Sequence, residues 1–270
     1  MRTVKYLVLV LVSFLSTSCM ITESVVFDAD ASGKIKYKFD MSQVMAMAGD
    51  QFGGAGEGVE GASRPKELMD STFTFKELYA GKQDSIANLP AAQQHKLKQI
   101  EKFSMRMIMD EANKTFVYEM FADFKSPSEL QEMVSPINGM SEFNPMGKTL
   151  PVDGTPKNDG ITRYAFDGKN FSKAVTLKSK EAIAEEMQRG LSKVLDSSES
   201  DELAGQMTEA MDMLFQQSTY DMVVTFPRKV KKVSVANAQL SEDGKTVTIT
   251  YPMENYMKSI DMNFEVELED

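Results

Sequence analysis

The sequence contains no tryptophan, one cysteine and one histidine among its 270 residues. One cysteine excludes an intramolecular disulfide, and one histidine excludes a metal site built on two histidines. The nucleophile elbow, the phosphate-binding glycine loop and the dinucleotide fingerprint are also missing. We therefore predict a protein without enzymatic activity that holds neither a metal ion nor a cofactor.

Paired carboxylates are the enzymatic signal that remains. Asp110 and Glu111 lie in an expected turn, and Glu185 and Glu186 lie on the polar side of an expected helix. Charged side chains in such positions are usually solvated. An activity that depends on carboxylates alone is the enzymatic alternative that the sequence leaves open.

The chain is acidic, with a formal net charge of −10. The first eighteen residues carry two basic and no acidic side chains, so their removal leaves −12 on residues 19–270. A protein of this charge is repelled by nucleic acids and by anionic lipid head groups. We therefore expect no nucleic-acid partner.

The first eighteen residues are typical of a targeting segment. Arg2 and Lys5 form a short positive region, and an apolar run follows from Tyr6 to Leu15. The run is about half as long as a membrane-spanning helix but suits the core of a secretory signal. We predict that residues 1–18 are a signal peptide.

The residues at the end of this segment resemble the lipobox of bacterial lipoproteins. Thr17 and Ser18 match the pattern before Cys19, whereas Ser16 stands where that family prefers a branched aliphatic residue. The resemblance implies that Cys19 becomes the new N-terminus and carries acyl chains such as palmitate, with residues 19–23 as a lipid-anchored tether. Met20 follows the cysteine in place of the aspartate that often signals inner-membrane retention, which implies the outer membrane.

An ordinary secretory cleavage site is the alternative at the same bond. Ser16 and Ser18 also fit the small-x-small pattern of such a site. Cleavage there would leave a secreted soluble periplasmic protein.

Alternating apolar and polar residues predict four hairpins, each followed by a helix. The hairpins are expected over 24–39, 103–124, 161–177 and 222–251, the helices near 42, 126, 183 and 253, further helices over 90–103 and 201–216, and a last strand over 262–268. This order predicts an α+β fold, in which an antiparallel curved sheet of repeated hairpin-helix units packs helices on one face. We expect a single ectodomain over residues 24–270.

Two segments interrupt the alternation. Residues 49–63 are rich in glycine, and residues 138–160 combine proline with glycine, so both are predicted to be flexible loops. The stretch from Asp28 to Gly33 resembles the start of an EF-hand, but Phe39 stands where the loop needs its bidentate acid. We therefore expect a β-turn there.

Methionine is abundant, with 21 residues. Met105, Met107 and Met109 alternate along one expected strand and so share one of its faces. A thioether cluster can hold Cu(I), but such sites usually gather histidines as well. The methionines either fill an irregular core or line a cavity for a lipid or other apolar ligand.

Two hairpin stretches resemble LppM-type bacterial lipoproteins. They read FDADASGKIKYKFDMS at residues 27–42 and FPRKVKKVSVANAQLSEDGKTVTITYP at residues 226–252. The resemblance implies a curved sheet around helices that is suggestive of a lipid-binding scaffold, and it assigns no functional residue.

Two roles for a lipid-anchored envelope protein follow from these patterns. In the first, the domain binds protein partners or assists envelope assembly. In the alternative, it binds or carries an apolar ligand against Met105, Met107 and Met109.

Overall fold

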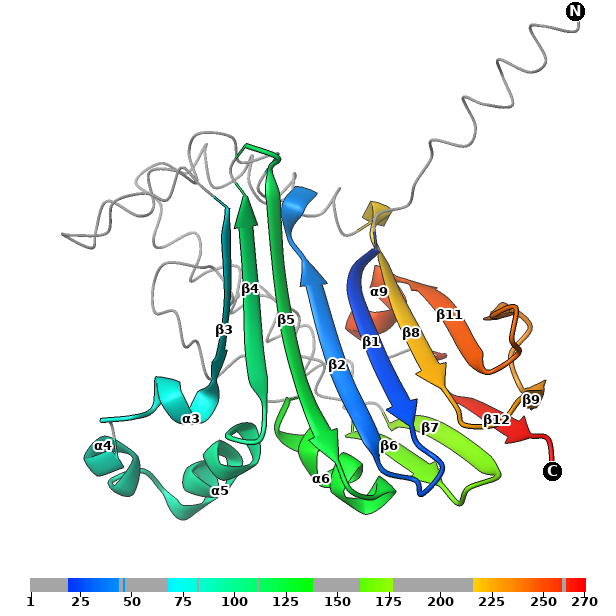
Figure 1. Cartoon of the computed structure of the whole chain (residues 1–270), viewed down its shortest axis with the longest axis horizontal. Helices are drawn as coiled ribbons and strands as arrows, with labels where there is room; N and C mark the ends of the chain where they lie inside the picture. Colours follow the sequence, from blue (N-terminus) through cyan, green and yellow to red (C-terminus); the bar gives the residue numbers. More distant parts are fainter. Residues whose placement is uncertain are drawn as a thin grey trace, which may run out of the picture.

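The structure is a computed structural model that describes residues 19–43, 46, 68–81, 83–110, 112–137, 161–176, 216–258 and 261–270. Within these ranges the chain forms one eight-stranded and one four-stranded sheet, with a few short helices (Figure 1). The fold is therefore α+β, as the alternation of apolar residues predicts.

The eight-stranded sheet has the order β10-β11-β8-β1-β2-β5-β4-β3. Its strands are β1 (Cys19–Phe27), β2 (Gly33–Asp40), β3 (Met69–Thr74), β4 (Ser104–Asp110), β5 (Thr115–Phe124), β8 (Thr219–Thr225), β10 (Ala238–Leu240) and β11 (Thr246–Pro252). Strand β1 lies in the middle, antiparallel to β2 and parallel to β8. The first strand of the chain thus joins the N-terminal and C-terminal parts of the sheet.

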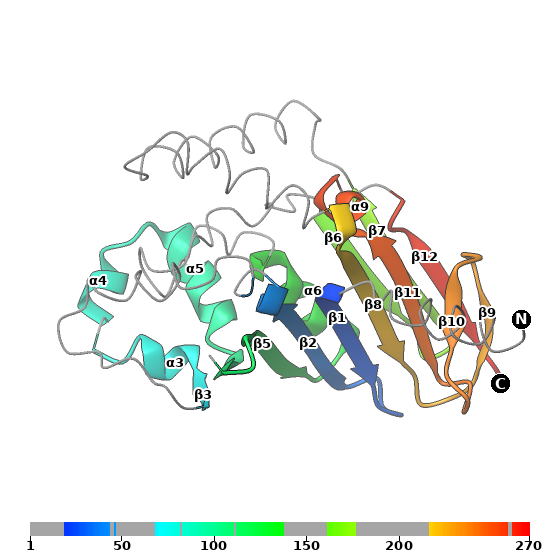
Figure 2. The same ribbon diagram turned by 90° about the horizontal axis from the view of Figure 1, so that it is seen from above.

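The four-stranded sheet has the order β6-β7-β12-β9. It consists of β6 (Ile161–Phe166), β7 (Asn170–Thr176), β9 (Val230–Val233) and β12 (Phe264–Leu268). Figure 2 shows this sheet stacked behind β8 and β11, whereas α3, α4 and α5 lie near β3 at the other side of the larger sheet.

Phenylalanines form the core between the two sheets. The Phe27 ring of β1 lies 4.4 Å from Phe166, 5.7 Å from Phe171 and 5.5 Å from Phe124, measured between centroids. Phe226, directly after β8, stacks on Phe27 at 6.0 Å. Burial of each such ring contributes about 1.5–3 kcal/mol, so this cluster is a principal contact that holds the sheets together.

The helices are short and serve the ends of the sheets. They are α3 (Phe75–Leu78), α4 (Gln83–Ala87), α5 (Ala91–Ile100), α6 (Pro127–Ile137) and α9 (Met253–Lys258). Helix α6 begins at a proline, and the Ser126 hydroxyl caps it by accepting from the Glu129 backbone N–H at 3.2 Å. Its Gln131 amide pairs with the Thr162 carbonyl and the Tyr164 N–H, which covers the edge of β6. No helix among the described residues is long and apolar enough to cross a membrane.

Three of the four predicted hairpins are confirmed, and the fourth is confirmed in part. The turn at Asp243 and Gly244 joins the antiparallel strands β10 and β11, and β11 also pairs antiparallel with β8. Strand β9, which lies between β8 and β10 in the sequence, belongs to the other sheet. The second layer also contains a sheet where the repeated hairpin-helix units predicted helices alone. Alternation reveals that a segment is a strand but does not reveal its partner, and β12 pairs with β7 and β9 across long stretches of chain. Four predicted segments lie largely outside the described residues: the loops 49–63 and 138–160, the helix near 183 and the helix over 201–216.

Candidate functional site

A buried pair of opposite charges joins the two sheets. Glu23 of β1 is 4 % exposed and Lys173 of β7 is 3 % exposed, and the Lys173 Nζ lies 3.0 Å from Glu23 Oε2. Both side chains occupy positions that face the partner sheet. This pair is the polar counterpart of the phenylalanine core, placed where the sheets meet.

Three tyrosine hydroxyls complete the hydrogen bonds of this carboxylate. Tyr164 donates to Glu23 Oε1 and Tyr220 donates to Glu23 Oε2, while the Tyr37 hydroxyl donates to Oε1 at 3.3 Å. Lys173 also donates to the Tyr220 oxygen at 2.7 Å. We call Glu23, Lys173, Tyr37, Tyr164 and Tyr220 the buried charge cluster.

Two tyrosine rings and a methionine sulfur also surround the Lys173 ammonium. The Lys173 Nζ lies 5.5 Å from the centre of the Tyr164 ring and 5.2 Å from that of Tyr220, and 3.4 Å from the Met222 sulfur. The Tyr256 ring of α9 stacks on Tyr220 at 4.5 Å. The aromatic rings therefore enclose the ammonium and exclude water from it.

The cluster shifts the pKa values of its members. Burial alone would raise the pKa of the Glu23 carboxyl, but the Lys173 ammonium and the hydroxyls of Tyr164 and Tyr220 outweigh burial and hold that pKa below its ordinary value. Burial lowers the pKa of Lys173, with Glu23 opposing the shift. Burial, reinforced by the Glu23 charge, raises the pKa of Tyr164 and Tyr220 well above 10.0. Glu23 and Lys173 are thus held as an ion pair between neutral tyrosines.

Sequence reasoning missed this cluster, although one signal for it exists. The inward positions of β1 are Ile21, Glu23, Val25 and Phe27, so a glutamate occupies one place in an apolar series. Such a residue must find a partner inside the protein. The partner could not be read from the sequence, because Lys173 lies 150 residues further along the chain.

The three candidate ligand-lining methionines share one face of β4, as predicted. Met105 is fully buried, Met107 is 5 % exposed and Met109 is half-buried. Met105 belongs to the main core and lies opposite Met120 in β5 and Phe73 in β3. They lie on other strands than the buried charge cluster, and their lining of a ligand cavity stays a prediction.

Cys19, the predicted lipidation site, lies at the start of a sheet strand. Cys19 is the first residue of β1 and is paired with Thr219 of β8. Residues 19–23, which were expected to form a tether, are therefore the first half of the central strand. The inward alternation of Ile21, Glu23 and Val25 ends before the cysteine, because Met20 and Ile21 are both buried and the pairing with β8 shifts register between Cys19 and Ile21.

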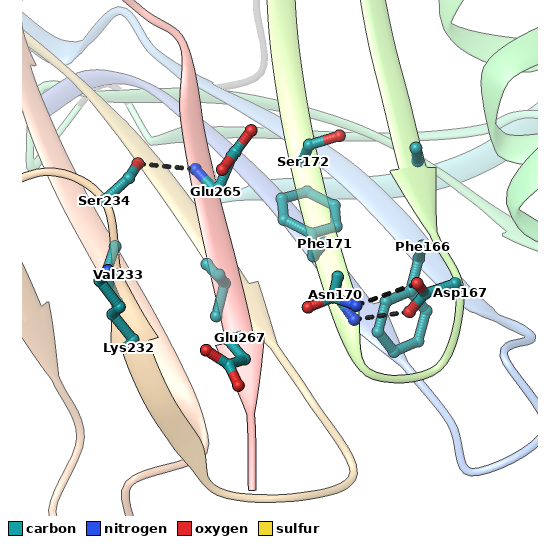
Figure 3. Close-up of a pocket in the computed structure, with 12 residues that line it drawn as sticks. Phe166, Asp167, Asn170, Phe171, Ser172, Lys232, Val233, Ser234, Glu265 and Glu267 are labelled. Carbon is teal, nitrogen blue, oxygen red and sulfur yellow. Dashed lines mark hydrogen bonds between the residues drawn. The ribbon is translucent and has the colours of Figure 1, made fainter.

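A shallow groove of about 680 Å³ crosses the four-stranded sheet on the side that faces away from the larger sheet. Figure 3 shows Glu265 and Glu267 on β12, an inner strand of the four-stranded sheet, with Ser172 on one side and Lys232 on the other. On the β9 side of the groove, the Ser234 hydroxyl accepts a hydrogen bond from the Glu265 backbone N–H at 2.8 Å, which fixes the position of Ser234. The groove is open and carries both signs of charge, which suits a polar partner segment more than a lipid chain.

The predicted β-turn over Asp28 to Gly33 is confirmed, and the single histidine lies on the surface. The Ser32 hydroxyl donates to Asp30 Oδ1 at 2.6 Å, and the Ser32 N–H donates to the same oxygen at 3.1 Å, which closes the turn between β1 and β2. His95 is exposed on α5. Across the part of the chain that the structure describes, no group of three or more His, Cys, Asp or Glu side chains is placed to hold a metal ion.

Comparisons with known proteins give one weak likeness. No protein-family model matches the chain, and no curated protein matches it. The chain is similar to the folded domain of LppM from Mycobacterium tuberculosis, solved by NMR, with 8 % identity, a TM-score of 0.36, and coverage of 93 % of this chain and 91 % of that one. LppM belongs to the group that the hairpin stretches resemble. At this TM-score the likeness carries no argument about function.

Proposed function

We propose that this chain is a lipid-anchored protein of the bacterial cell envelope, attached through Cys19 to the outer membrane, whose domain binds protein partners and catalyses no reaction. The observation that carries the proposal is the position of Cys19. The signal-like segment of residues 1–18 ends directly before Cys19, and Cys19 is the first residue of the central strand β1. The acyl chains would then be attached directly to the sheet.

Two features support binding over catalysis. Glu23 and Lys173 are 4 % and 3 % exposed, so this buried acid and base are closed to a substrate. The groove beside Glu265 and Glu267, in contrast, is open and lined by exposed polar side chains. A surface of this kind fits a polar segment of another protein, which completes its hydrogen bonds from outside.

The Cys19→Ser variant tests the anchor. A serine hydroxyl cannot form the thioether that carries the acyl chains, so we expect the variant to move from the membrane fraction to the soluble periplasmic fraction. Fractionation of cells after osmotic shock, followed by immunoblotting, measures this shift. The expected change is loss of nearly all membrane-bound protein.

The Ser16→Ala variant is the matched control, because it changes the same segment and keeps the cysteine. It should remain in the membrane fraction after a wash with high salt. Retention of the Cys19→Ser variant on membranes would contradict the proposal. A wild-type chain that is soluble from the start would support the ordinary secretory cleavage site instead.

A further inference from the structure

We infer that the domain stands end-on on the bilayer: the end of the eight-stranded sheet at which β1 begins contacts the lipid surface, and the opposite end points into the aqueous phase. The inference rests on the proposed anchoring through Cys19. It adds an interaction surface, the partner of which is a lipid head-group layer, and it predicts which side of the domain other proteins can reach.

Cys19 is itself a residue of the sheet, so no flexible linker separates the acyl chains from the fold. Cys19 pairs with Thr219, and Ile21 pairs with both Phe39 of β2 and Tyr220 of β8. A flexible tether would let the domain rotate freely above the membrane. A residue held in the sheet lets the domain tilt but keeps its own end of the strands at the lipid surface.

Strand β1, which begins with Cys19, lies near the middle of the eight-stranded sheet. Strands β8, β11 and β10 lie on one side of it and β2, β5, β4 and β3 on the other. With neighbouring strands about 4.8 Å apart, the sheet extends roughly 15–20 Å to each side of the anchor. An attachment point in the middle of this end keeps the strands on both sides of β1 close to the lipid surface. An attachment point on an edge strand would keep only that side of the sheet close to it.

Several other segments lie at the same end of the sheet as Cys19. Strand β8 begins there at Thr219, β11 ends there at Pro252, and β2 ends there at Asp40. The turn from Ala112 to Lys114 between β4 and β5 lies at this end as well (Figure 1). These segments would contact the head groups beside Cys19.

The opposite end holds the turns that close the other hairpins. They include the turn from Asp28 to Ser32 and the turn at Asp243 and Gly244. The nine residues of β1 span about 30 Å, so these turns lie that far from the anchored edge. The groove next to the β6–β7 turn would accordingly face the aqueous phase, where a protein partner can approach.

Short-range fluorescence quenching tests this orientation on the full chain. Acylation consumes the thiol of Cys19, so a second cysteine is the single reactive thiol of the lipidated protein. We would label the Ala112→Cys and Glu242→Cys variants with the same dye, because both residues are exposed in hairpin turns at opposite ends. Each labelled protein is bound to phosphatidylcholine vesicles whose head groups carry a nitroxide quencher.

The dye on the Ala112→Cys variant should lose most of its fluorescence, and the dye on the Glu242→Cys variant should keep its own. Equal quenching of both dyes, or stronger quenching at Glu242→Cys, would overturn the end-on orientation while the anchor still stands. Flotation of the vesicles tests the anchor separately. A wild-type chain that fails to float with the vesicles would overturn the anchoring and the orientation together.

Discussion

The Glu23→Gln variant is expected to lose about 3–5 kcal/mol of unfolding free energy, because it removes one partner of a buried ion pair. The Lys173 ammonium, 3 % exposed, would be left without a counter-charge. The glutamine amide can still accept from Tyr164 or Tyr220, but it cannot neutralise the ammonium. Urea unfolding of the domain followed by circular dichroism measures the loss.

Asp123→Asn is the matched control for a surface pair. Asp123 lies 3.2 Å from Lys34, and their side chains are 78 % and 51 % exposed, so we expect a change of about 0–1 kcal/mol. The double variant Glu23→Gln with Lys173→Met should recover part of the loss, because it leaves no unpaired charge. A Glu23→Gln domain as stable as the wild type would show that the cluster does not hold the sheets together.

The same pair gives stability a defined pH dependence. The folded-state pKa of Glu23 lies below its ordinary value of 4.5, so the ionised carboxylate stabilises the fold fully above that pH. This contribution is lost as the pH falls through the lower folded-state pKa. The Glu23→Gln variant should lack this component of the acid-side decline in stability.

The Gly33→Ala variant is expected to lose about 3 kcal/mol, because a new methyl group would overlap the backbone of the neighbouring strand. A Cβ atom at Gly33 would lie 1.8 Å from the Val26 carbonyl oxygen and 2.7 Å from Cζ of Phe124. The Phe124 ring could rotate away, but the Val26 carbonyl belongs to the central strand. Relief of the clash would require β1 and β2 to separate locally, and thermal unfolding measures the effect.

Gly244→Ala is the control, because Gly244 has a φ of +69° and its nearest neighbour would lie 3.8 Å from the new methyl group. Only the left-handed backbone opposes that substitution, at a cost of about 1–2 kcal/mol. The expected order is therefore Gly33→Ala more damaging than Gly244→Ala. The reverse order would contradict the close packing of β2 on β1.

The sequence predicts the strands well because each hairpin is a local feature. The turns between β1 and β2, between β4 and β5, and between β6 and β7 all combine alternating flanks with turn-forming residues, and all three hairpins form. The division into two sheets could not be predicted in this way. Strands β8 and β1 pair in parallel although about 200 residues separate Glu23 from Tyr220, and no local pattern specifies that contact.

The same distinction between local patterns and long-range contacts decides which candidate site residues could be predicted. Cys19 could be singled out because the signal-like segment before it is contiguous in the sequence. Glu23 could have been noticed as an acid in an apolar series, but Lys173 and the tyrosines come to it from four other strands. The groove around Glu265 has no sequence signature, because its lining residues are ordinary outward positions of paired strands.

The intact mass of the protein extracted from membranes tests the central claim most directly. We expect a chain that begins at Cys19 and carries the added mass of several acyl chains, with the modification located on the N-terminal peptide. An unmodified chain that begins at Cys19, or a chain that retains residues 1–18, would contradict the proposed anchoring.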